Sequence, residues 1–234
     1  RVGKPSEGGE ADPRSRTVEL SIDTSTRYAS VALSDQGEAI AELTWHSQRN
    51  HSVELTPAVR ELTSRAGLQM NELEAVFVAR GPGGFSALRV GLSTAKGLGV
   101  SLGIPLVALN TLDSEAYPFR GLGLPVCSIL DMGRGEVAMA LYAGGKGDWN
   151  KIREEQIMTP EDLCSTVREP TLFCGEGVSL VRQVLEEGLG DAAVVAEQSL
   201  PTRRPGALSQ MGYERFQRGE RDDIYSLEPL YLRR

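Results

Sequence analysis

The chain has 234 residues, of which 40% are apolar and 24% are charged, and its formal net charge is −7. This length suffices for one large domain or for two lobes of roughly 100 residues, with enough apolar material for a buried core. The acidic balance argues against a protein that binds nucleic acid by itself. The lack of any apolar run of about 18 residues argues against a membrane-spanning protein.

Residues 1–16 read RVGKPSEGGEADPRSR, which is polar, charged and rich in Gly and Pro. We expect these residues to be a flexible leader outside the fold. The three cysteines, Cys127, Cys164 and Cys174, are widely spaced and form no CxxC pair. This usage favours a reducing compartment and predicts a cytoplasmic protein.

Residues 17–112 are predicted to form an N-terminal lobe of strands and helices. Three apolar runs joined by polar turns predict an antiparallel meander, and two later strands are expected to run parallel because a helix precedes each of them. The expected strands are residues 18–23, 27–33, 39–45, 73–79 and 104–109. One expected helix stops at Gly67 and begins either near His51 or at Pro57. The other expected helix covers residues 86–103.

Residues 113–234 are predicted to form a C-terminal lobe that repeats this pattern. In each half an apolar strand ends in an aspartate, Asp23 or Asp131, and a polar turn leads to a second apolar strand. The expected strands of this lobe are residues 125–131, 137–143 and 171–178, and its expected helices are residues 160–167 and 178–188. The repetition predicts two related lobes.

The stretch RGPGGFSALRVG, residues 80–91, lies between a predicted strand and a predicted helix, which is the layout of a phosphate-binding loop. It lacks the GxxxxGK[ST] pattern of a Walker loop, and Ser86 stands where a dinucleotide fingerprint needs its third glycine. The following helix has two rows of small residues four apart, which are Gly91, Ala95, Gly99 and Gly103, and Ser93, Gly97 and Ser101. Such rows let another backbone approach closely. Packing on the protein's own sheet and packing against a partner explain them equally well.

Catalytic patterns are sparse in this sequence. The two histidines, His46 and His51, lack metal-ligand spacing, so no metal site is expected. No GxSxG nucleophile elbow occurs. The best candidate is IDTST, residues 22–26, because a strand-ending carboxylate followed by hydroxyls can hold hydrated magnesium and bind phosphate oxygens. Capping of a turn by the same Asp and Thr side chains is the competing interpretation.

Five segments within residues 18–234 follow one another in a distinctive order: LSIDTSTRYASVAL, RNHSVELTP, VARGPGGFSALRVGLSTAKGLGVSLGIPLVALNTL, DMGRGEVAMALY and PLYLRR. Together they resemble the bacterial TsaB family, also called YeaZ. The block that begins RGPG is highly specific, although it departs from the usual RGPGSFTGLRIG at Gly84, Ser86 and Ala87. These residues stay small, so the helix start is expected to survive, while the loss of a hydroxyl at position 84 is expected to alter loop capping.

The resemblance implies a two-lobed α/β fold of the actin, Hsp70 and sugar kinase superfamily, in which each lobe is a mixed sheet with flanking helices. It implies a non-catalytic subunit for forming N6-threonylcarbamoyladenosine at position 37 of tRNA. Such a subunit supports TsaD, which transfers the threonylcarbamoyl group, and the ATPase TsaE joins the pair. The implied subunit has no cofactor of its own: ATP or ADP with magnesium, and the tRNA itself, belong to the complex. The glycoprotease-like label of the family finds no support in this sequence.

The resemblance also implies a docking face. The helices around residues 51–66 and 87–102 are expected to pack against their equivalents in TsaD as a four-helix interface. The candidate interface residues are His51, Leu55, Val59, Leu62, Leu88, Leu92, Ala95 and Gly99, and the vestigial phosphate-binding candidates are Asp23, Thr24, Ser25 and Asp131. Two alternatives stay open: a small-molecule kinase of the same superfamily that uses Asp23 and Asp131 around Mg-ATP, and a homodimeric scaffold that pairs through the same helices.

Overall fold

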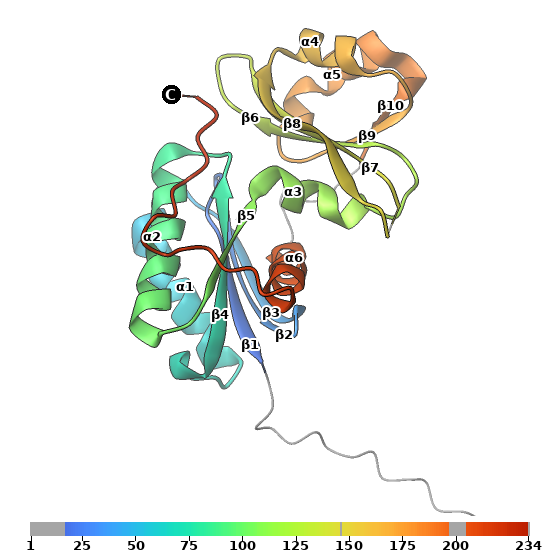
Figure 1. Cartoon of the computed structure of the whole chain (residues 1–234). Helices are drawn as coiled ribbons and strands as arrows, with labels where there is room; N and C mark the ends of the chain where they lie inside the picture. Colours follow the sequence, from blue (N-terminus) through green and yellow to red (C-terminus); the bar gives the residue numbers. More distant parts are fainter. Residues whose placement is uncertain (1–16, 146, 197–204, 234) are drawn as a thin grey trace, which may run out of the picture.

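A computed structural model describes residues 17–145, 147–196 and 205–233. The leader predicted for residues 1–16 lies outside these ranges. Figure 1 shows two lobes, each built on one β-sheet, with a short helix between them. In the described ranges, no helix combines the length and the apolar character that crossing a membrane requires.

The first sheet has the strand order β3-β2-β1-β4-β5. Its strands are β1 (Val18–Asp23), β2 (Tyr28–Asp35), β3 (Glu38–His46), β4 (Leu73–Gly81) and β5 (Leu106–Asn110). The first three strands form an antiparallel meander, and β4 and β5 add in parallel beside β1. The predicted meander and the predicted parallel crossovers are therefore confirmed.

Two helices, α1 (His51–Arg65) and α2 (Phe85–Leu102), cover one face of this sheet (Figure 1). The helix α1 begins at His51 and contains Pro57, which decides between the two predicted starts. Pro57 is the seventh residue of α1, so it lies in the second turn and removes the helical hydrogen bond that another residue would donate to the carbonyl of Val53. Apolar side chains of both helices, such as Leu55 and Leu92, pack on Ile22 and Val78 of the sheet.

The second sheet has the same arrangement, with the order β10-β9-β6-β7-β8. Its strands are β6 (Val126–Asp131), β7 (Val137–Ala143), β8 (Asn150–Met158), β9 (Thr171–Cys174) and β10 (Ala193–Val195). The helices α4 (Pro160–Thr166) and α5 (Val178–Leu189) pack on one face of it. Each strand and helix has a counterpart at the same place in the first lobe, so the predicted duplication is confirmed.

Two of these strands were not predicted. The strand β8 has the sequence NKIREEQIM, whose charged residues alternate with half-buried ones because it lies at the edge of its sheet. The strand β10 has three residues, all half-buried. Short edge strands give weak hydrophobic patterns, and this explains why neither was predicted. Three 3-10 turns, η1 (Met70–Glu72), η2 (Tyr117–Phe119) and η3 (Gly190–Ala192), complete the connections.

Two further helices were not predicted: α3 (Thr111–Ala116) and α6 (Pro205–Gln217). Each follows the strands of one lobe in sequence and packs on the sheet of the other lobe. Leu112 and Ala116 of α3 pack into the core of the second sheet. Leu208 of α6 packs against Phe77 and Leu109 on the face of the first sheet that α1 and α2 leave open (Figure 1). The expected division after residue 112 therefore does not describe α6, which follows the second lobe in sequence and packs on the first.

The chain then returns across the first lobe. The backbone N–H of Asp222 donates to Leu106 O at 2.9 Å, and that of Leu230 donates to Arg80 O at 2.7 Å. Further along, Arg233 forms an ion pair with Glu136 in the turn between β6 and β7. The last described residues thus run along α2 and reach the second lobe (Figure 1).

Candidate functional site: the pocket between the lobes

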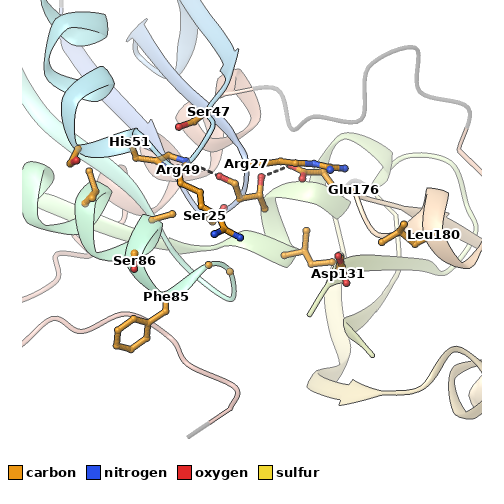
Figure 2. Close-up of a pocket in the computed structure, with 17 residues that line it drawn as sticks. Ser25, Arg27, Ser47, Arg49, His51, Phe85, Ser86, Asp131, Glu176 and Leu180 are labelled. Carbon is orange, nitrogen blue, oxygen red and sulfur yellow. Dashed lines mark hydrogen bonds between the residues drawn. The ribbon is translucent and has the colours of Figure 1, made fainter. Parts of the chain in front are cut away.

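A pocket of about 750 Å³ lies where the two lobes meet, and Figure 2 shows the side chains around it. The first lobe contributes the β1–β2 turn, the segment before α1 and the glycine-rich loop before α2. The second lobe contributes the end of β6 and the start of α5. Of the four candidate phosphate ligands, Ser25 and Asp131 line the pocket, whereas Asp23 and Thr24 are not among its lining residues and are buried.

The turn after β1 is held by bonds within the protein. The backbone N–H and the hydroxyl of Ser25 both donate to Asp23 Oδ1, at 2.8 and 2.5 Å. The hydroxyl of Thr24 donates to the carbonyl of Ala87 in α2 at 2.7 Å. These side chains fix the turn and the helix that follows the glycine-rich loop, as the competing interpretation of IDTST expected.

The glycines before α2 serve close packing on this same turn. A Cβ at Gly83 would overlap the carbonyl of Ser25, and one at Gly91 would overlap the hydroxyl of Thr24. The backbone N–H of Gly84 donates to Ser25 O at 2.7 Å. This amide of the loop therefore donates to the protein's own backbone, whereas the amides of a phosphate-binding loop donate to the ligand.

Charged side chains of both signs face the pocket. Arg27 and Arg49 lie on the first-lobe side (Figure 2), and Asp131 and Glu176 lie on the second-lobe side. The hydroxyl of Thr26 donates to Glu176 Oε1 at 2.5 Å and thereby joins the two lobes. A carboxylate at this position disfavours an incoming phosphate, because like charges repel strongly where water is partly excluded.

Three of these charged residues were not predicted. Glu176 belongs to GEG, which follows β9 as RGPGG follows β4, so the internal repeat could have pointed to it. Arg27 and Arg49 lie in two segments that carry the family resemblance, but only the fold brings them to one pocket. His51 lines the same pocket, and its Nε2 donates to the carbonyl of Thr26 at 2.9 Å.

The eight predicted interface residues lie on the inner side of α1 and α2. All eight are buried in the chain's own fold: His51, Leu55, Val59, Leu62, Leu88, Leu92, Ala95 and Gly99. The 3.6-residue spacing of the apolar residues predicted the helix α1 correctly, and the stripe that they form packs on the first sheet.

The other small row of α2 lies outside. Ser93, Gly97 and Ser101 are exposed, and a Cβ at Gly97 would meet no atom within 4 Å. Two apolar side chains of the same pair of helices are also exposed: Val53 of α1 is 69% exposed and Val100 of α2 is 55% exposed. We call these five residues the outer α1/α2 face. Of the other row, Gly91, Ala95 and Gly99 are buried, whereas Gly103 is exposed just after the end of α2. The two rows that the sequence left ambiguous therefore lie on different sides of α2.

Comparison with known proteins relates the whole chain to one group. The family model of TsaD, tRNA N6-adenosine threonylcarbamoyltransferase, matches residues 41–224. A Bacillus subtilis protein named tRNA threonylcarbamoyladenosine biosynthesis protein TsaB is 32% identical over 92% of this chain and 93% of its own length. An Escherichia coli protein of the same name is 27% identical over 92% of this chain and 94% of its own length.

The chain belongs to the TsaB family. The structure of YeaZ from Pseudomonas aeruginosa agrees with this membership: it is 28% identical, with a TM-score of 0.76 over 92% of this chain and all of that one. The ethanolamine utilization protein EutJ from Carboxydothermus hydrogenoformans, at 15% identity and a TM-score of 0.53 over 86% of this chain and 92% of that one, shares the fold alone. The two-lobed α/β fold that the TsaB resemblance implied, with a mixed sheet and flanking helices in each lobe, is confirmed.

The departures from the usual TsaB loop leave the start of α2 intact. Gly84 is the N-cap and makes no side-chain capping bond, but the backbone N–H of Leu88 donates to Gly84 O at 2.9 Å.

Burial raises the pKa of the Cys127 and Cys174 thiols. Both cysteines lie in strands of the second sheet, and their side chains are buried in the core of this TsaB family member.

Proposed function

We propose that this chain is a non-catalytic subunit for the formation of N6-threonylcarbamoyladenosine in tRNA, and that it acts by binding a TsaD-like catalytic chain. The observation that carries the proposal is the internal hydrogen bonding of the turn after β1, where the sequence offered candidate phosphate ligands. Its three polar side chains, Asp23, Thr24 and Ser25, hold the turn and α2 together by internal hydrogen bonds. A chain of this family with that turn committed to its own structure suits a supporting role.

The outer α1/α2 face is the proposed docking surface. Its small residues let a second helix come close, and its exposed valines offer apolar area without a large hydrophobic patch. The helices themselves are those that the family resemblance implied. Their partner-facing side chains are reassigned to Val53, Ser93, Gly97, Val100 and Ser101.

The other members of the assembly follow from the same proposal. A TsaE-like ATPase joins the pair, ATP or ADP and magnesium act at the level of the complex, and tRNA is held through the complex. The net charge of −7 supports this division of labour, because this chain has little electrostatic attraction of its own for a polyanion. The complex is proposed to be cytoplasmic.

The first test combines size-exclusion chromatography with light scattering and a tRNA modification assay. The chain is measured alone and mixed with the TsaD-like chain of the same source. We expect a one-to-one complex, with threonylcarbamoylation in the mixture and none with either chain alone. A chain that stays homodimeric in the mixture would favour the scaffold alternative, and ATP hydrolysis by the isolated chain that Asp23→Ala abolishes would favour the kinase.

A pair of matched variants tests the docking surface. Val100→Asp places a charge in the outer α1/α2 face, and Ile152→Asp places one on β8 of the other lobe, where the side chain is 56% exposed against 55% for Val100. We expect Val100→Asp to weaken binding of the TsaD-like chain by about tenfold or more, since one desolvated charge readily costs about 1.4 kcal/mol. Ile152→Asp should bind normally. Equal affinities of both variants, with intact folds, would remove this face from the proposal.

A further inference from the structure

A second cavity, of about 520 Å³, lies on the side of α3 and α6. It shares no lining residue with the pocket described above. Its walls come from α3 and η2, from the hairpin of β7 and β8, and from α6, so both lobes contribute to it. A cavity of this volume takes a small organic molecule.

The lining of this cavity is cationic in an acidic protein. Four of its side chains are basic and two are acidic: Arg120, Lys151, Arg215 and Arg218 against Asp113 and Glu214. The whole chain carries a net charge of −7. Local positive charge within a concave surface raises the concentration of anions there.

Internal bonds satisfy part of this charge. Lys151 pairs with Asp113 at 2.8 Å and also with Glu155, and Arg215 pairs with Glu220 at 2.6 Å. The hydroxyl of Tyr142 donates to Asp113 at 2.6 Å, and that of Tyr117 donates to Glu214 at 2.5 Å. Both acidic side chains of the lining are therefore already engaged as acceptors.

Three groups keep donors to spare. Arg120 lies over the ring of Tyr117 at 3.7 Å and donates to the carbonyl of Tyr117, with no carboxylate partner in the described part of the chain. Arg218 has a 64% exposed side chain, caps a carbonyl of its own helix, and reaches Glu220 only at 3.7 Å. Trp149, stacked on Tyr142 at 5.5 Å, has an indole N–H that meets no acceptor among the described residues.

We propose that this cavity binds a small phosphorylated molecule through a phosphate monoester held by Arg120, Arg218 and Trp149. The three donors come from three separate elements, so their ligand must present oxygens in several directions. A tetrahedral phosphate does so, whereas a flat carboxylate presents its two oxygens in one plane. Guanidinium groups bind phosphate oxygens through charge-assisted hydrogen bonds, often two at a time.

Trp149 supplies the readout. The chain contains two tryptophans, Trp45 and Trp149, so Trp45→Phe leaves the cavity tryptophan as the sole indole fluorophore. The full chain carrying Trp45→Phe is titrated with ribose 5-phosphate, and sodium chloride is used to keep the ionic strength of the solution constant. We expect saturable change in Trp149 fluorescence. Arg120→Ala and Arg218→Ala should each weaken binding about tenfold, the usual loss for one charge-assisted hydrogen bond.

Arg221→Ala is the matched control. Arg221, like Arg218, follows α6 in sequence, but it does not line the cavity. Its guanidinium carbon lies 3.8 Å from the centre of the Phe216 ring. Thermal unfolding of each variant establishes that it is folded, and the exposed Arg218 keeps the test valid if Arg120→Ala disturbs Tyr117. Equal weakening by Arg221→Ala, or the same fluorescence change with sodium acetate at equal ionic strength, would overturn the proposal. Because the readout is direct binding, its result is independent of any partner chain.

Discussion

The two lobes have one topology and use it differently. In the first lobe the turn after β1 is buried: Asp23 bonds to Ser25, and Thr24 bonds to α2. In the second lobe the turn after β6 is exposed, and Asp131 bonds to the backbone N–H of Gly133 at 2.7 Å. The same strand-turn-strand unit is thus locked onto its helix in one lobe and open in the other.

The difference lies in how each copy of the duplicated frame is held against its helix. Both lobes retain a glycine that packs against the end of their first strand: a Cβ at Gly83 would overlap Ser25, and one at Gly177 would overlap Leu130. Only in the first lobe do hydroxyls also bind the turn to the helix. Rigidity therefore lies in the lobe that carries the proposed docking helices.

The largest expected effect comes from breaking the packing of this turn on α2. Gly91→Leu should destabilise the protein by about 3 kcal/mol or more, because the new side chain has to displace Thr24 and shift the helix. Chemical denaturation measures the loss. Gly97→Leu, six residues along the same helix, should unfold no earlier than the parent, because its side chain enters open space and glycine is a poor helix former. A similar loss in both variants would refute a specific role for the inner row.

The next effect compares the two aspartates. Asp23→Ala should cost about 2 to 3 kcal/mol, because it leaves the N–H and hydroxyl of Ser25 without this acceptor in a buried turn. Asp131→Ala should cost less than about 0.5 kcal/mol, since Asp131 is exposed. Urea unfolding of the two variants side by side checks the ranking. If Asp131→Ala proved the more costly, the second turn would be the structural one.

The smallest effect concerns the second residue of each lobe's first strand. Burial raises the pKa of Glu19 to about 7 from an ordinary 4.5, although Ser34 and Gly37 donate to its Oε2. The stability that this group contributes is present below pH 4.5 and is lost as the pH rises through about 7. Its counterpart Cys127 is a buried neutral thiol and contributes no such change.

Glu19→Gln should therefore flatten the dependence of unfolding free energy on pH between 5 and 8. We compare the unfolding free energy of the variant with that of the parent at each pH. The difference, variant minus parent, should be about 1 to 2 kcal/mol larger at pH 8 than at pH 5. Thermal or urea unfolding across this range gives both curves. Parallel curves for parent and variant would mean that Glu19 titrates near its ordinary pKa.

Apolar runs and stripes predicted the elements that are most buried. The strands β1 and β4 and the helices α1 and α2 carry long apolar patterns, so their existence and type were predictable. The edge strand β8 is mostly polar, and the helix α3 has six residues, so neither has a pattern long enough to be recognised. At the site, the sequence left IDTST open between a phosphate-binding turn and a capped turn, because the hydrogen bond from Thr24 to Ala87 joins residues 63 positions apart.

The sequence by itself determined the strand-turn-strand unit that recurs in each half, the apolar stripes on α1 and α2, the absence of a Walker or dinucleotide pattern, and the family to which the chain belongs. Tertiary structure decided which stripe faces inward, that α6 packs on the first sheet, and which charged side chains share a cavity. The physical reason is that periodicity reports that a face is buried but not what buries it. That depends on contacts such as Leu208 with Phe77, which join residues more than a hundred positions apart.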